Sequence, residues 1–372
     1  MTANQFAPIK SWNNGRNPMF CLGCDVGGSG LRIRFSNYFN PSEYIDVKHI
    51  KAQNTADALR HLNELSAKIK KVAPNAESRG AAIAVAGPIK DNTVIFTNWP
   101  GKAENRTVSL NQLPKTLFPQ GHSLFLNDLE AGAYGVIAAE EQGVLSPLFE
   151  QMWPEIAPKG KLISDNRTAV LAMGSGLGVA LIVKTPILQQ PLVVPSELGH
   201  LQIPTVCFRH KDYLNEQQLI QFVSDHYYNG RQMPEYEDIA SGRGLCLAYQ
   251  YEYDRINQVK IPLDQIEGGE VAQLAQKGDK IARKALLYHY LYFMRAAKAV
   301  STTLSCDSVL MALDNQVKND WFVRSAFDEL CEEFYHFIRP DWMKSIRVYT
   351  QVKTLNFNIL GTDYMAHKIA DK

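Results

Sequence analysis

Residues 120–139 read QGHSLFLNDLEAGAYGVIAA, and this stretch decides the fold class. Its apolar run Leu124–Leu126 is typical of a buried strand, and residues 129–139 are compatible with a helix. In an open α/β sheet the ligand lies beyond the carboxyl ends of the strands, where Asn127 and Asp128 stand. Asn and Asp are also favoured N-caps of helices. This stretch alone therefore supports a catalytic and a capping interpretation equally.

A glycine-rich turn occurs twice in the chain. The tetrapeptide Gly-Ser-Gly-Leu stands at 28–31 and again at 174–177, each time between two predicted strands. The repetition indicates two structurally related halves. Glycines let the backbone approach a ligand closely, and successive N–H groups bind anions, although ordinary hairpins use the same residues. The candidate phosphate-binding residues are Gly27, Gly28 and Ser29 in the first turn and Gly174, Ser175 and Gly176 in the second.

Asp25 ends the first predicted strand, directly before the first glycine turn. A carboxylate beside a phosphate group is repulsive unless a cation lies between them. We therefore expect Mg²⁺ near Asp25, held largely through water, as is usual for this ion at phosphate sites.

The remaining pattern predicts a mixed sheet with helices on its faces. Apolar residues three or four positions apart predict a helix over 55–72. Residues 1–19 are polar and predict a loose arm, and 147–168 predict an irregular excursion between elements. Further strands are expected at 20–25, 31–36, 44–50, 81–86, 93–97, 169–173, 179–183, 309–313 and 346–351, and helices at 216–228, 241–253, 270–276, 279–304, 321–337 and 362–370.

Composition bounds the class of protein. A chain of 372 residues is long enough for two domains, and 45% hydrophobic with 21% charged residues is ordinary for a soluble protein. The net charge of +1 argues against nucleic-acid binding. No stretch has the length and apolar character of a signal peptide or membrane span, so we expect a cytoplasmic protein. Cys21 and Cys24 lack a second ligand pair, which favours buried thiols over a structural zinc site.

Three polar residues of the second half could bind a hydroxylated ligand. Glu197 and His200 stand in the segment Ser-Glu-Leu-Gly-His, and Glu237 precedes a predicted helix. A carboxylate can accept two hydrogen bonds at once, which suits a ligand with several hydroxyl groups such as a sugar. The alternative is that His200 is a structural histidine and that Glu237 only leads into the helix. No HExxH, GxSxG or GxxxxGK[ST] motif is present, which leaves metalloprotease, esterase and P-loop readings without support.

In their order, these motifs resemble the microbial glucokinase family of the hexokinase–actin superfamily. Residues 25–29 (DVGGS) and 174–178 (GSGLG) are similar to its two phosphate motifs, and 126–131 (LNDLEA) to its catalytic motif. Residues 197–200 (ELGH) are similar to its sugar segment. Glu237 with 241–245 (SGRGL) is similar to its later Glu…Ser-Gly-Pro-Gly-Leu segment. The wording from Phe118 to Gly132 is especially similar to glucokinases of parasitic protists.

The resemblance implies an α/β fold of two ribonuclease H-like domains with a cleft between them. The small domain would cover 20–126, joined by a C-terminal helix at about 359–372, and the large domain 127–358. The implied reaction is ATP-dependent phosphorylation of glucose at its 6-hydroxyl, with Asp128 as general base. The implied sugar-binding residues are Asn98, Asn127, Asp128, Glu197, His200 and Glu237. The glycine turns would hold ATP phosphates with Mg²⁺ near Asp25, and the family suggests a homodimer.

Two departures and two alternatives accompany this resemblance. Ala312-Leu313-Asp314-Asn315 stands where the family has paired glycines, so we expect Leu313 to narrow the adenine pocket. Leu198 replaces a glycine of the sugar segment, which bears on sugar selectivity.

One alternative function is a kinase for mannose, fructose or an N-acylhexosamine. The other is a non-catalytic sugar-binding relative. Repressors of this superfamily carry a DNA-binding module ahead of the first strand, and we expect the about twenty residues before the first strand here to be too few for such a module.

Overall fold

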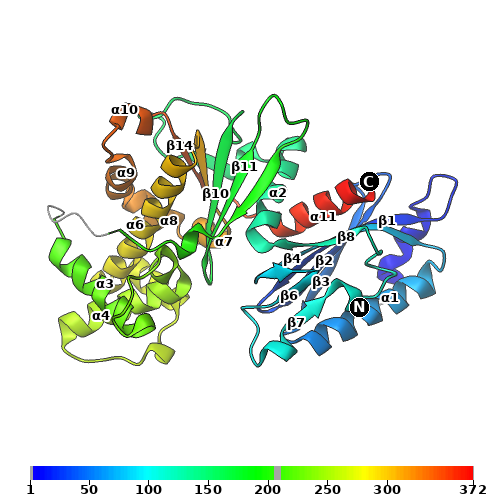
Figure 1. Cartoon of the computed structure of the whole chain (residues 1–372), viewed down its shortest axis with the longest axis horizontal. Coiled ribbons are helices and arrows are strands. Elements are labelled where there is room, and N and C mark those ends of the chain that lie inside the picture. The colour runs from blue at the N-terminus through cyan, green and yellow to red at the C-terminus, as the bar shows by residue number, and fades with distance from the viewer. Residues whose placement is uncertain (1–2, 205–210, 372) are drawn as a thin grey trace. The chain divides into compact units, whose positions relative to one another are not determined.

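The computed structural model describes residues 3–204 and 211–371 and divides the chain into two compact units (Figure 1). Unit 1 comprises Met1–Leu145 together with Asn356–Lys372, and unit 2 comprises Ser146–Leu355. Unit 1 is therefore built from both ends of the chain, whereas unit 2 is continuous.

The main sheet of unit 1 has five strands in the order β3-β2-β1-β4-β8. The first three form an antiparallel meander, and β4 and β8 run parallel to β1. The bounds are β1 Met19–Gly27, β2 Gly30–Asn37, β3 Tyr44–Lys51, β4 Glu77–Val85 and β8 Ser123–Asn127. A separate three-stranded sheet contains β5 Ile89–Lys90, β6 Thr93–Ile95 and β7 Thr107–Ser109.

One face of this sheet is covered by α1 (Thr55–Val72), with the bounds that the periodicity predicts. Asn54 caps the helix by accepting a hydrogen bond from the N–H of Asp57. The 3₁₀ helix η1 (Ala3–Ser11) contributes to the same hydrophobic core. The prediction of a loose arm at 1–19 is wrong, because Phe6, Ile9 and Trp12 are buried in this core.

The opposite face is covered by α2 (Asp128–Glu141) and α11 (Phe357–Ala370), which lie together in Figure 1. The backbones approach unusually closely. A Cβ at Gly361 would lie 1.8 Å from the carbonyl oxygen of Ala131, and one at Gly80 would lie 2.1 Å from that of Ala366. Only glycine fits at these two positions, and the two glycines allow α11 to lie directly against α2 and β4.

The first segment of unit 1 ends at Leu145, whereas the domain boundary expected from the sequence lies at 126/127. The reason is the packing of α2, whose residue Ala131 shares a hydrophobic cluster with Ala366 and Ala370 of α11. Asn127 and Asp128 therefore both belong to unit 1.

Unit 2 contains a six-stranded sheet in the order β12-β11-β10-β13-β14-β9. Its first five strands repeat the order and directions of the sheet in unit 1, which confirms the prediction of two related halves. The bounds are β9 Phe149–Gln151, β10 Arg167–Met173, β11 Leu177–Val183, β12 Leu192–Ser196, β13 Ser308–Ala312 and β14 Arg347–Gln351. The short strand β9 lies inside the segment predicted to be irregular.

In unit 2, helices α4, α5 and α9 pack against α6, which carries the buried rings of Tyr288, Tyr290 and Phe293. The bounds are α3 Tyr213–Tyr228, α4 Gly242–Asn257, α5 Gly268–Gln276, α6 Lys280–Thr303, α7 Asp314–Lys318, α8 Asp320–Ser325, α9 Phe327–Tyr335 and α10 Pro340–Met343.

The single helix predicted over 321–337 is two helices, α8 and α9, separated at Ala326. Phe322 contacts Tyr290, and Phe327 contacts Trp153. Residues five positions apart point about 140° away from each other on a continuous helix. The break lets both rings reach the core of unit 2.

The cysteine prediction is confirmed. Cys21 and Cys24 are free and buried in separate hydrophobic clusters on the two faces of β1. Burial raises the pKa of both thiols. Within residues 3–204 and 211–371, no group of three or more His, Cys, Asp or Glu side chains could hold a metal ion. No helix in these ranges is long and apolar enough to cross a membrane.

A buried polar cluster joins α11 to β2. The hydroxyl of Ser36 donates to Oδ1 of Asp363 (2.5 Å) and lies 2.8 Å from Nε2 of His367. Burial raises the pKa of Asp363 to about 6, although the Ser36 hydroxyl and the charge of Arg34 oppose the change. Burial also lowers the pKa of His367 to about 4. The fold therefore favours the uncharged form of both groups.

Replacing Asp363→Asn removes the ionisation. The folded pKa of about 6 lies above the ordinary value of 3.8, so the wild-type carboxyl favours folding most below pH 4 and loses that contribution toward pH 6. We expect the free energy of unfolding in urea, variant minus wild type, to rise by on the order of 3 kcal/mol between pH 4 and pH 7. Asp91→Asn, at an exposed position, is the control. A difference independent of pH would contradict the assignment.

Candidate functional site

The expected catalytic pair lies at the carboxyl edge of the parallel strands of unit 1. In the register of the sheet, Val26 of β1 pairs with Val85 of β4, and Val85 pairs with Asn127 of β8. Adjacent strands lie about 4.8 Å apart. The first glycine turn and Asn127 therefore lie at the same edge of the sheet, and two strand spacings separate the strands that lead into them.

The boundary between β8 and α2 fixes both residues of the pair. Asn127 is the N-cap: its side chain accepts from the N–H of Leu129 (3.0 Å), and Glu130 closes a capping box by accepting from the N–H of Asn127 (3.2 Å). Asp128 is the first helical residue, and its Oδ1 also accepts from the N–H of Leu129 (2.8 Å). The capping interpretation is thus correct for Asn127, and the cap holds the Asp128 carboxylate at the helix N-terminus.

The first glycine turn is a two-residue hairpin loop, because Gly27 pairs with Gly30. The register then places Arg32 opposite Asp25, and its guanidinium contacts Oδ2 of the carboxylate at 3.0 Å. Asn358 of α11 contacts Oδ1 at 3.4 Å. Asp25 therefore already has a cationic partner, which the sequence argument for a nearby cation did not include.

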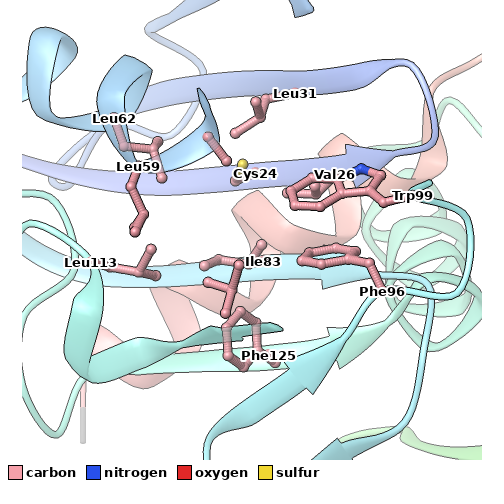
Figure 2. Close-up of a pocket in the computed structure, with 12 residues that line it drawn as sticks. Cys24, Val26, Leu31, Leu59, Leu62, Ile83, Phe96, Trp99, Leu113 and Phe125 are labelled. Atoms are coloured by element: carbon pink, nitrogen blue, oxygen red, sulfur yellow. The ribbon is translucent and has the colours of Figure 1, made fainter. Parts of the chain in front are cut away.

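Trp99 connects the turn to the loop that carries Asn98. Its indole N–H donates to the carbonyl oxygen of Gly27 (3.2 Å), and its ring stacks on Phe96 at 4.1 Å. Figure 2 shows both rings among the residues that line an apolar cavity in the core of unit 1. Its volume of about 20 Å³ is too small for a sugar or nucleotide. The backbone and side chain of Asn98 lie against Gly28, and its side-chain oxygen is buried with no partner among the described residues.

The second glycine turn, in unit 2, is held by Glu237. Oε2 of Glu237 accepts from the N–H of Leu177 (2.9 Å), and Oε1 contacts the guanidinium of Arg243 (2.7 Å). A Cβ at Gly176 would lie 2.5 Å from Oε2, so the glycine leaves room for this carboxylate. Both oxygens of Glu237 thus have protein partners.

Glu197 and His200 lie close to the same turn. The 3₁₀ helix η5 (Leu198–His200) contacts β11, and a backbone pairing of Gln202 with Glu235 joins it to the 3₁₀ helix η6 (Tyr236–Asp238). Nδ1 of His200 lies 2.7 Å from Glu235, and Nε2 lies 3.9 Å from Glu197. The hydrogen bond to Glu235 is the main cause of the raised pKa of His200. Glu235 therefore belongs to this cluster.

A pocket of about 800 Å³ opens beside the second glycine turn, entirely within unit 2. Gly174 and Ser175 line it together with the N-terminal residues of α4 and α5. Its charged lining residues are Arg243, Lys318 and Glu267. Its volume lies within the range of small-molecule sites.

Each unit thus carries its own part of the expected site. Unit 1 holds Asp25, Gly27, Gly28, Ser29, Asn98, Asn127 and Asp128, and unit 2 holds Gly174, Ser175, Gly176, Glu197, His200 and Glu237.

Comparison with known proteins decides the family. The family model for glucokinase matches residues 22–312. The chain is 58% identical to Glucokinase 1 of Trichomonas vaginalis, over 98% of this chain and 97% of that protein. It is 54% identical to Probable glucokinase 2 of the same organism, over 95% and 93% of the two chains. The chain belongs to the glucokinase family.

The fold agrees with this family. The crystal structure of glucokinase from Balamuthia mandrillaris in complex with glucose matches with a TM-score of 0.88 and 29% identity, over 98% of each chain. The predicted α/β class with two domains is thereby confirmed. Membership of the glucokinase family makes this chain an enzyme that phosphorylates a sugar.

Among the described residues, sequence reasoning missed several side chains that contact glucokinase motif residues, and three of them show why. The first is Arg32, which hairpin register would have placed opposite Asp25. The second is Glu235, whose signal was its position two residues before Glu237 in Pro-Glu-Tyr-Glu. The third is Trp99, which had no signal, because its bond goes to a backbone carbonyl distant in sequence.

The two departures from the glucokinase pattern have different structural outcomes. Leu198 is partly buried against the core of unit 2, so we expect it to affect sugar selectivity through the position of η5. Leu313 is not among the residues that line the pocket beside the second glycine turn, and its expected effect on an adenine pocket stays a prediction. Its backbone adopts φ 83° and ψ 164°, a region that is almost restricted to glycine. The departure therefore introduces backbone strain at position 313.

This strain can be measured by comparing glycine and alanine at position 313. Leu313→Ala keeps the unfavourable backbone conformation, whereas Leu313→Gly relieves it, and both lose the same leucine contacts. We expect Leu313→Gly to have the higher free energy of unfolding in urea, by about 1 kcal/mol or more. The order should reverse at Asn315 in α7, where alanine is the better helix residue. Alanine as the more stable choice at both positions would contradict the strain.

Proposed function

We propose that this protein transfers the γ-phosphoryl group of ATP to the 6-hydroxyl of glucose and forms glucose 6-phosphate. The observation that carries this proposal is the 58% identity to Glucokinase 1 of Trichomonas vaginalis over nearly the whole of both chains. The glucose complex of the Balamuthia enzyme, whose fold is similar, supports the same sugar.

Asp128 acts as the general base in this proposal. Its Oδ1 accepts from the N–H of Leu129 at the start of α2, and the positive end of a helix dipole favours an ionised carboxylate. An ionised carboxylate can take the proton of the 6-hydroxyl while that oxygen attacks phosphorus. Phosphoryl transfer depends mostly on positioning and charge neutralisation, for which a carboxylate fixed by a helix cap is suited.

The sugar-binding residues are proposed from both units. In unit 1, Asn98 offers a buried side-chain oxygen without a described partner, and Asn127 flanks the base. In unit 2, Glu197 has an exposed carboxylate, and His200 has its ring oriented by Glu235. Glu237 would contribute directly once Oε1 is released from Arg243.

The pocket beside Gly174 and Ser175 is the proposed ATP site, because a glycine turn and two cationic side chains suit phosphate groups. From the family pattern, Gly27, Gly28 and Ser29 of the first turn are proposed as further nucleotide-binding residues. The described residues hold no cluster of carboxylates for a resident cation, and Asp25 already pairs with Arg32. We therefore expect Mg²⁺ to arrive with ATP, keep most of its water and neutralise phosphate charge, and Asp25 is the carboxylate that the family pattern assigns to it.

A coupled assay with ATP tests the substrate. Glucose, mannose, fructose and N-acetylglucosamine are compared at equal enzyme concentration, and we expect the highest kcat/KM for glucose. A higher value for another hexose would contradict glucose as the substrate and favour the alternative kinase. No turnover with any of the four would favour a non-catalytic sugar-binding relative.

Replacing Asp128→Asn keeps the shape of the side chain but removes the base. We expect kcat to fall by about 10²- to 10⁴-fold, because the base acts in the transition state, while the Kd for glucose changes little. The matched control is Glu130→Gln, in the same helical turn, where the amide oxygen can still close the capping box. Near-normal kcat in Asp128→Asn, or an equal loss in Glu130→Gln, would contradict the assignment.

The cytoplasmic location and the homodimer stay predictions from the sequence and the family.

A further inference from the structure

We propose that Arg243 has two alternative partners, Glu237 in the free protein and a nucleotide phosphate in the complex. This inference rests on the proposed ATP site in unit 2. It assigns a phosphate-binding role to a residue that the family pattern Ser-Gly-Pro-Gly-Leu does not provide, because arginine stands here in place of proline.

The backbone brings Arg243 to the second glycine turn. Gly242, the first residue of α4, donates its N–H to the carbonyl oxygen of Gly174 (2.9 Å). Arg243 is the next residue and lines the same pocket as Gly174 and Ser175. Its side chain therefore starts at the place where the proposed phosphate groups would lie.

The charge of the pocket fits an anion there. Arg243 and Lys318 are its cationic lining residues, and Glu267 is its acidic one. His289 also lines the pocket, but burial lowers its pKa to about 4, so the ring is neutral at pH 7. A guanidinium binds phosphate through two parallel N–H groups, which a proline at position 243 could not do.

The present partner of Arg243 can be exchanged. Its guanidinium contacts Oε1 of Glu237 at 2.7 Å, yet the Arg243 side chain is 57% exposed and the Glu237 side chain 15%. Oε2 of Glu237 stays anchored by the N–H of Leu177. If Arg243 turns to a phosphate, the carboxylate keeps its position and only Oε1 becomes available.

The consequence is competition between Glu237 and the nucleotide for one guanidinium. Removing the arginine should weaken phosphate binding, whereas removing the charge of Glu237 should strengthen it. An independent sugar-binding role for Glu237 would not change nucleotide affinity in the absence of sugar. These opposite signs distinguish a shared arginine from a structural ion pair.

The experiment measures the Kd values of ADP and adenosine by calorimetry without sugar, using the full chain. In Arg243→Met we expect the Kd of ADP to rise about tenfold or more and that of adenosine to stay unchanged, because adenosine has no phosphate. In Glu237→Gln we expect a lower Kd for ADP than in wild type, with adenosine again unchanged. In the double variant, Glu237→Gln should not change the Kd of ADP further, because the guanidinium for which Glu237 competes is already absent. The double-mutant cycle measures this coupling.

Two controls keep the test specific. Arg339→Met removes an equally charged, exposed side chain outside the pocket and should leave both Kd values unchanged. Arg243→Lys keeps the charge and should lose less ADP affinity than Arg243→Met.

Three results would overturn this inference and leave the proposed reaction intact: Arg243→Met binds ADP as tightly as wild type, Arg243→Met loses as much affinity for adenosine as for ADP, or Glu237→Gln gains no affinity for ADP. Wild-type protein that binds neither ADP nor adenosine would overturn both.

Discussion

The alignment of Val26, Val85 and Asn127 in one row across three strands is the constraint on which the proposed position of the general base depends. It places the end of β8 at the same sheet edge as the first glycine turn. Because Asn127 then caps α2, the next residue, Asp128, is set at a helix N-terminus rather than on a loop. The close approach of α11 at Gly361 holds α2 against the sheet. Sheet register, helix cap and glycine packing thus position one carboxylate together.

In unit 2 the corresponding glycine turn is held by a charged side chain, that of Glu237. Glu237 bonds to the N–H of Leu177 and to Arg243, so the shape of the turn and the charge of the neighbouring pocket are linked. The two units therefore share a topology but differ in what stabilises their glycine turns. In unit 1, Trp99 bonds to the backbone of Gly27, which is a neutral contact.

Sequence patterns predicted the features that depend on local spacing. The helix over 55–72 follows from its apolar period, and the strand–polar–helix order placed Asp128 correctly. Features that depend on distant partners were missed. The strand β9 pairs only with β14, about 200 residues away, and three residues carry too little periodicity to be recognised. The buried N-terminal segment did have a signal, since Phe6, Ile9 and Trp12 recur every third residue as on a 3₁₀ helix.

The origin of unit 1 from both ends of the chain has a consequence for synthesis. Residues up to Leu145 leave the ribosome before unit 2, but the sheet face that contains Cys21, Ala82 and Ala84 is covered partly by α11, which is made after unit 2. Unit 2 is continuous and can fold before α11 is made. The nascent N-terminal segment must therefore keep an apolar surface exposed while all of unit 2 is translated. That interval is when a chaperone would be most needed.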